Sequence, residues 1–164
     1  MARTSTKTKP RRSATRRATA RRKPQAKARK AVRPKTAGRK QRFVVSHQRE
    51  EDFAEGLRRY AKYRDLGIAE ATSGLVRAHV IRFVPPCDPK EVSKRHFHDV
   101  DFQMVYVLKG WIKTEIAGQG AITMRAGSAW IQPPRIEHVV LDYSDDCEVL
   151  EVILPAEFKT VELE

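Results

Sequence analysis

Three histidines stand at a spacing that β-structure can fold into one metal site. His96 and His98 are separated by one residue, and His138 follows 40 residues after His98. Side chains alternate between the two faces of a strand, so His96 and His98 should project from the same face. Neutral imidazoles bind iron, manganese, nickel, zinc and copper. The three residues therefore predict a site for a divalent transition metal and leave its identity open.

Gln103 stands where a carboxylate would be the usual fourth ligand. An amide oxygen is a weaker ligand than a carboxylate and carries no charge. A divalent ion held by three His and Gln103 would keep nearly its full charge and leave coordination positions open, as catalytic sites require. It would also attract an anionic small-molecule substrate. The alternative is that Gln103 is a polar core residue and that the domain binds a ligand without catalysis.

Short strands must position these side chains. Apolar and polar residues alternate in seven segments, and Gly-containing turns follow several of them. We expect strands at 75–84, 103–108, 111–117, 120–125, 128–132, 137–142 and 147–154. Many short strands joined by tight turns predict an all-β, antiparallel sandwich or barrel.

Two motifs in this region resemble those of the cupin superfamily of small β-barrels. Residues 90–110 correspond to its first motif, with the HXH pair and Gly110, and residues 127–142 to its second, with Gly, Pro and His at the expected spacing. The chain departs from the family pattern at Lys90, Gln103, Arg135 and Asp142. The resemblance implies a double-stranded β-helix, or jelly-roll barrel, and a homodimer. It also implies metal ligands at His96, His98, Gln103 and His138.

Charge is distributed unevenly along the chain. Residues 1–42 contain 18 Lys and Arg and no acidic residue, whereas residues 43–164 hold the other 15 basic and all 20 acidic residues, a net charge of −5. Because large apolar side chains are nearly absent from 1–42, we expect a disordered tail that binds DNA, RNA or an anionic membrane surface through its charge. A misassigned translation start is the alternative. The expected parts are this tail, a linker with a short amphipathic helix at 43–69, and the cupin barrel at 70–164.

The predicted helix begins near Ser46, which can cap it, and Phe53, Leu57, Tyr60 and Ala61 recur on one side at helical spacing. Cys87 and Cys147 form no metal-binding or redox motif and predict free thiols. We expect a cytoplasmic protein, because the sequence has neither an apolar signal segment nor a stretch long enough to span a membrane.

Three functions are compatible with these features. The leading hypothesis is a metal-dependent small-molecule enzyme, with a dioxygenase as the first guess. The second is a non-catalytic sensor or binding module that holds a ligand in the barrel and nucleic acid on the basic tail. The third is a lyase or isomerase acting on a sugar or carboxylic acid, which differs from the first in needing no O2.

Overall fold

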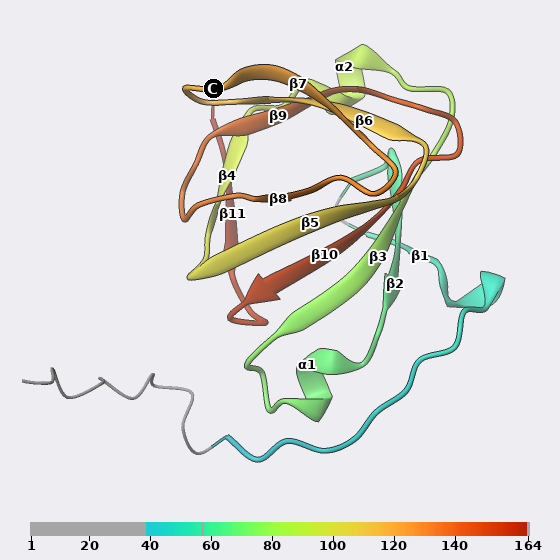
Figure 1. The fold of residues 1–164 in the computed structure, drawn as a ribbon, viewed down its shortest axis with the longest axis vertical. Coiled ribbons are helices and arrows are strands. Elements are labelled where there is room, and N and C mark those ends of the chain that lie inside the picture. Colours follow the sequence, from blue (N-terminus) through green and yellow to red (C-terminus); the bar gives the residue numbers. More distant parts are fainter. Residues whose placement is uncertain (1–38, 57, 164) are drawn as a thin grey trace, which may run out of the picture. The chain divides into compact units, whose positions relative to one another are not determined.

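Two antiparallel β-sheets face each other in the computed structural model, which describes residues 39–56 and 58–163 (Figure 1). The predicted tail lies almost entirely outside these residues. One sheet has six strands in the order β1-β2-β3-β10-β5-β8, and the other has five in the order β11-β4-β9-β6-β7. Every strand pairs antiparallel with its neighbours, as in a jelly roll. The fold class expected from the sequence is confirmed.

The strands of the six-stranded sheet are β1 (Ala54–Glu55), β2 (Ala61–Asp65), β3 (Arg77–Phe83), β5 (Phe102–Lys109), β8 (Ala129–Ile131) and β10 (Glu148–Leu154). Those of the five-stranded sheet are β4 (His96–Asp99), β6 (Trp111–Ile116), β7 (Gly120–Arg125), β9 (His138–Tyr143) and β11 (Lys159–Glu162). The helical segments are short: a 3-10 turn at Glu50–Asp52, α1 (Ile68–Ala71) and α2 (Pro89–Val92).

All seven strands predicted from alternation are present, with ends that differ by a few residues. The turn at Gly110 shows why that position requires glycine. Its backbone has φ +62, and a Cβ there would lie 2.0 Å from Ser144 Oγ. Only a residue without a side chain accepts both the left-handed conformation and the close approach. This turn starts β6, which pairs with the His138-bearing strand β9.

The helix predicted from Ser46 is wrong. Residues 50–52 form a single 3-10 turn, and residues 61–65 form β2, which pairs with β3 over five positions from Ala61↔Phe83 to Asp65↔His79. Without β2, one edge of β3 would present unpaired backbone N–H and C=O groups. Tertiary hydrogen bonding therefore overrides the helical periodicity of this segment. The short N-terminal helix of the domain is α1 instead.

The core lies between the sheets, where inward side chains from both meet. Its buried cluster consists of Phe83, Val92, Val105, Val107, Ile112, Met124, Tyr143, Cys147 and Val149. Both cysteines are free, as expected, and burial raises the pKa of the Cys147 thiol to about 12. Among the described residues, none of the helices has the length and apolar character needed to cross a membrane.

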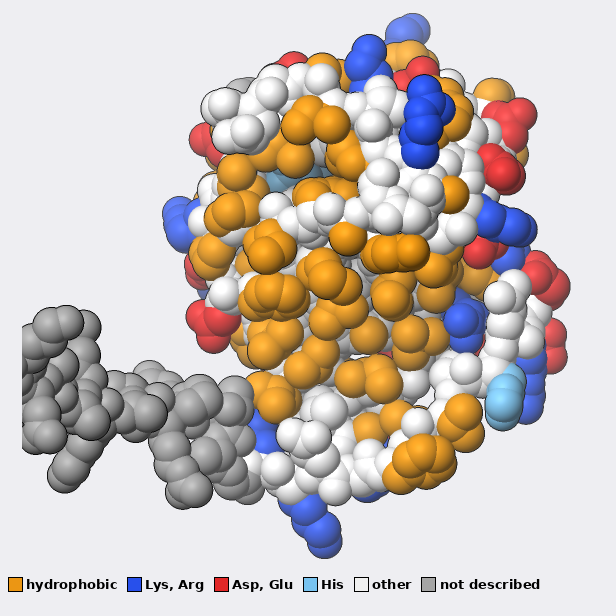
Figure 2. All heavy atoms as spheres, in the orientation of Figure 1, with side chains coloured by type: hydrophobic (Ala, Val, Ile, Leu, Met, Phe, Trp, Pro, Cys, Tyr) orange, Lys and Arg blue, Asp and Glu red, His pale blue; other side chains and the backbone are white. Residues whose placement is uncertain are grey.

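The six-stranded sheet also presents an apolar outer face. Figure 2 shows hydrophobic side chains gathered on the side that carries β3, β10, β5 and β8 in Figure 1. Tyr106, Leu108 and Ile131 are exposed large hydrophobic residues of this sheet. Contiguous apolar surface of this kind marks many protein interaction sites.

Candidate metal centre

Two neighbouring strands of one sheet bring the three histidines together. His96 and His98 lie on β4, and His138 begins β9, where it pairs directly with His96. One ring nitrogen from each of the three residues lies within 4.8 Å of the others. The expected clustering of the three imidazoles is therefore present, although His138 lies far from the pair in sequence.

Each imidazole is oriented by a hydrogen-bond partner at Nδ1. His96 Nδ1 lies 2.8 Å from the carbonyl oxygen of Lys94, and His138 Nδ1 lies 3.0 Å from that of Ile136. A carbonyl oxygen only accepts, so both Nδ1 atoms must donate. His98 Nδ1 lies 2.9 Å from the hydroxyl oxygen of Thr160 on β11. The two carbonyl contacts leave the Nε2 lone pairs of His96 and His138 free, which is the tautomer that a metal ligand needs, and the Thr160 hydroxyl can accept from His98 Nδ1 to give the same tautomer there.

Burial keeps the three imidazoles neutral. It lowers the pKa of His98 and of His138 to about 4, and it lowers the pKa of His96 in the same way. Desolvation is the largest cause in all three, because a charged imidazolium loses water contacts when it is buried. At neutral pH no proton competes with a metal for these nitrogens. The donor set thus fits a divalent transition metal.

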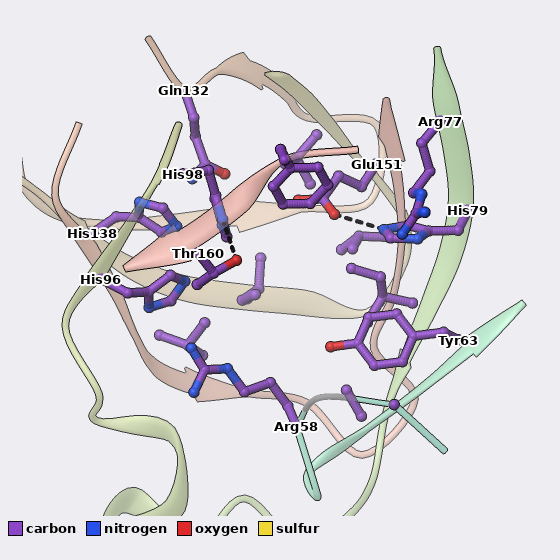
Figure 3. A pocket seen from close by; sticks show the side chains of 18 of the residues that line it. Arg58, Tyr63, Arg77, His79, His96, His98, Gln132, His138, Glu151 and Thr160 are labelled. Carbon is purple, nitrogen blue, oxygen red and sulfur yellow. Dashed lines mark hydrogen bonds and ion pairs between the residues drawn. The ribbon is translucent and has the colours of Figure 1, made fainter. Parts of the chain in front are cut away.

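The histidines line a cavity of about 580 Å³ between the two sheets. In Figure 3 the three imidazoles lie on one side of this cavity, and His79 and Glu151 lie on the other. The metal-site side comes from the five-stranded sheet, while Arg77, His79 and Glu151 come from β3 and β10 of the six-stranded sheet. Apolar side chains fill much of the wall between them: Ile81, Phe83, Val105, Ile112, Val140 and Val149.

Gln103 is bonded to a carboxylate on the neighbouring strand. It is 1% exposed, and its Nε2 donates a hydrogen bond of 2.6 Å to Glu151 Oε1. Its amide nitrogen is therefore engaged, and only its Oε1 could serve a metal. The assignment of Gln103 as fourth ligand stays a prediction.

Glu151 is the functional candidate that sequence reasoning missed. Its Oε2 lies 2.6 Å from His79 Nε2, so both carboxylate oxygens have a partner. Burial opposes ionisation of Glu151, but the hydrogen bonds from His79 and Gln103 outweigh it and the pKa of Glu151 is lowered. A signal was present in the sequence: Glu151 stands between Val149 and Ile153 at the inward positions of an alternating strand.

His79 faces the cavity beside Tyr63 of β2. Their ring centroids are 5.5 Å apart with the rings steeply inclined, and burial raises the pKa of the Tyr63 hydroxyl. His79, Glu151 and Tyr63 thus add a polar cluster to a cavity whose opposite wall carries the metal-site candidates.

Arg135 occupies a backbone position that favours glycine. Its φ is +61, the left-handed region, at the place where the cupin pattern has glycine. The guanidinium carbon lies 4.5 Å from the ring centroid of Phe97, and Nη1 lies 3.4 Å from Asp99 Oδ1. Arg135 and Asp99 are exposed and lie outside the cavity lining.

Comparison with known proteins gives a family match to part of the chain and a fold. A family model described as a cupin domain matches residues 87–153. Among solved structures, KdgF from Halomonas sp. matches with a TM-score of 0.54 and 17% identity, covering 71% of this chain and 96% of that one. The polyketide cyclase RemF from Streptomyces resistomycificus matches with a TM-score of 0.56 and 18% identity, covering 74% and 87%. The search of curated proteins found no significant match.

Larger enzymes share the fold as well. The oxalate decarboxylase of Lactobacillus farciminis, solved as a formate complex, matches with a TM-score of 0.53 and 15% identity, covering 69% of this chain and 34% of that one. The chain thus spans about a third of that enzyme's length. The cupin-domain model thus matches residues 87–153, and the two sheets form a jelly roll like that of these solved structures. The domain carries a histidine cluster that can hold a metal.

Proposed function

We propose that this protein is a metal-dependent enzyme that acts on a small anionic molecule inside the barrel. The carrying observation is the cluster of three imidazoles, each with a hydrogen-bond partner at Nδ1 and with ring nitrogens within 4.8 Å of one another. His96, His98 and His138 would hold a divalent ion, with Gln103 as the proposed fourth ligand. The ion would act as a Lewis acid toward an oxygen of the substrate.

Three neutral ligands support an anionic substrate. They leave the charge of a divalent ion uncompensated, so an anion would gain more from binding there than a neutral molecule. The Lactobacillus oxalate decarboxylase was solved with formate, and the Bacillus subtilis oxalate decarboxylase has Mn(II) centres. Both observations are consistent with metal and carboxylate chemistry in this fold.

The cavity favours proton transfer over reaction with O2. A dioxygenase was the first expectation from the sequence. A lyase or isomerase needs a group that takes up or delivers a proton. His79, oriented by Glu151, lies on the wall opposite the three imidazoles and supplies such a group. We therefore place a lyase or isomerase ahead of a dioxygenase.

Elemental analysis of the protein purified without chelator tests the metal site. We expect close to one equivalent of a transition metal per chain, lost in the His96→Ala and His138→Ala variants. His47→Ala serves as the control, because His47 is exposed and outside the cluster. Metal at trace levels in the wild type, unchanged in the two cluster variants, would refute the proposal. Oxygen consumption, once a substrate is found, separates a dioxygenase from a lyase or isomerase.

The binding-module alternative rests on the basic segment. Residues 1–42 carry 18 positive charges and no negative charge. A protein without turnover on any small molecule while loaded with metal, and with salt-dependent retention on DNA, would favour a sensor over an enzyme.

A further inference from the structure

The cavity collects hydrogen-bond donors that have no acceptor. Among the described residues, five buried side-chain polar atoms lack a partner, and all five are N–H donors. Four of them belong to residues that line this one cavity: Arg58 Nη2, Arg77 Nε, Trp130 Nε1 and Gln132 Nε2. An unpaired buried donor costs about 1–3 kcal/mol. Four in one cavity indicate that a ligand rich in acceptors satisfies them.

Arg58 is one of the donors that face the metal-site candidates. Its side chain is 10% exposed, and in Figure 3 the guanidinium points toward His96. Nη1 is paired with Glu162 on β11, so Nη2 is the nitrogen that remains available.

Gln132 reaches the imidazoles from the other direction. It follows β8 and is 5% exposed, and Figure 3 shows its amide on the side of the triad opposite to Arg58. Its backbone nitrogen is already bonded to the Gln103 carbonyl, which fixes the main chain there. A ligand over the three imidazoles would thus find one charged donor and one amide donor on its flanks.

The cavity lining carries charged groups of both signs. Arg58 and Arg77 are its arginines, and Glu151, Asp65 and Glu157 are its carboxylates. A guanidinium forms paired hydrogen bonds with a planar carboxylate as well as with a phosphate. A monoanionic carboxylate is repelled less by Glu151 than a dianionic phosphate, so we take a carboxylate as the ligand.

We propose that Arg58 anchors the acid group of a carboxylate substrate beside the three-histidine centre, and that Gln132, on the other side of the triad, donates a hydrogen bond to a second oxygen of the same molecule. This rests on the proposed function, because the rest of the molecule would meet the metal and the His79–Glu151 pair. Arg58 would orient the acid group and Gln132 a second oxygen, so that the rest of the substrate faces the opposite wall.

The first experiment is calorimetric titration of zinc-loaded protein with pyruvate and, in parallel, with inorganic phosphate. We expect pyruvate to bind more tightly than phosphate. Arg58→Gln should weaken pyruvate binding roughly 10- to 100-fold, the value of a charge-assisted hydrogen bond, at unchanged zinc content. Arg59→Gln is the matched control, since Arg59 is the exposed neighbour and lies outside the cavity lining.

The second experiment uses Gln132→Leu, which removes an unpaired donor at similar volume. It should raise the thermal midpoint of the ligand-free protein and weaken pyruvate binding about tenfold. A merely structural glutamine would not produce this opposite pair of changes.

The outcomes separate the two proposals. Pyruvate affinity unchanged in both variants, or phosphate binding more tightly than pyruvate, overturns the carboxylate subsite while zinc binding remains. A wild-type protein that fails to bind zinc contradicts the proposed function instead. In that case, pyruvate binding to the metal-free protein that is still lost in Arg58→Gln would support the subsite, and no binding would overturn it.

Discussion

His138 illustrates at the scale of one residue how burial prepares a ligand. Its side chain is buried, and desolvation lowers its pKa to about 4 from the 6.5 of an exposed imidazole. Metal binding should therefore resist acidification until the pH approaches 4, because only then do protons compete for the ring.

The same depressed pKa makes stability depend on pH. Above pH 6.5 the imidazole of His138 is neutral in both the folded and the unfolded chain. As the pH falls from 6.5 toward 4, only the unfolded chain takes up the proton, so stability decreases, by about 3 kcal/mol for a single shift of this size. Urea unfolding of the metal-free protein should show that His138→Asn costs progressively less as the pH falls through this window. A constant cost would contradict the assignment of a depressed pKa.

A negative charge introduced at Gln103 should destabilise the fold of the metal-free protein. In Gln103→Glu, the hydrogen bond to Glu151 would be replaced by two buried carboxylates, and their repulsion would raise the pKa of the pair. We expect the free energy of unfolding to fall by about 2–3 kcal/mol at pH 7.5 and by less at pH 5, where one of the two carboxylates takes up a proton. Gln119→Glu, at an exposed turn, is the control.

Metal affinity in the same variant tests Gln103 as a ligand. If the side chain faces the ion, the new carboxylate should tighten binding. Unaltered affinity would show that Gln103 serves to hold Glu151 and is no ligand.

At the scale of elements, strand β11 connects the C-terminal segment to the metal centre through a side-chain contact. Its pairing with β4 places Thr160 opposite His98, and the Thr160 hydroxyl is the partner of His98 Nδ1. Residues that orient a ligand typically change metal affinity by 10- to 100-fold when they are removed.

Thr160→Val should therefore weaken metal binding about tenfold while leaving the fold intact, since valine suits a strand. Competition with a metallochromic chelator measures the change. Thr123→Val, on an exposed position of β7, provides the comparison. Equal metal affinities in the Thr160→Val and Thr123→Val variants would show that Thr160 does not support metal binding.

The sequence predicted strands well where two signals agree: the alternation of apolar and polar residues along the strand, and turn residues at its ends. From Phe102 to Leu154 each change of direction has a turn signal, and the structure follows the prediction. Residues 46–65 have no such agreement: Phe53, Tyr60 and Ala61 recur at helical spacing, but the open edge of β3 pairs with 61–65. The metal-site histidines were predictable from local spacing. Glu151 and Arg58 were not identified, because their roles depend on which strands meet across the cavity.

At the scale of the whole molecule, the apolar outer face of the six-stranded sheet supports the homodimer that the family resemblance implies. Ile131, on β8 of this sheet, is 60% exposed. Ile131→Asp should lower the mass measured by sedimentation equilibrium from dimer to monomer, because a charge is costly at an apolar contact. Ile122→Asp, 41% exposed on β7 of the other sheet, should leave it unchanged. A wild-type protein that sediments as a monomer would contradict the predicted dimer.

The basic segment 1–42 should control retention on nucleic acid. Deleting it removes 18 positive charges and leaves a domain with a net charge of −5. Full-length protein should bind DNA with an affinity that falls steeply with salt, and the truncated protein should not bind. Retention that survives the deletion would place the DNA contact in the domain. Mass spectrometry of the native protein decides whether the segment is present in the cell.

The separation of the two cavity walls has a consequence for how this protein can change over generations. The three imidazoles belong to one sheet, whereas Arg77, His79 and Glu151 belong to the other. Substitutions at inward positions of β3 and β10, other than Glu151 which holds the proposed ligand Gln103, can therefore alter substrate specificity while the three imidazoles stay in place. A mutant library confined to those two strands should retain metal in most of its members, and it offers a direct route to altered specificity.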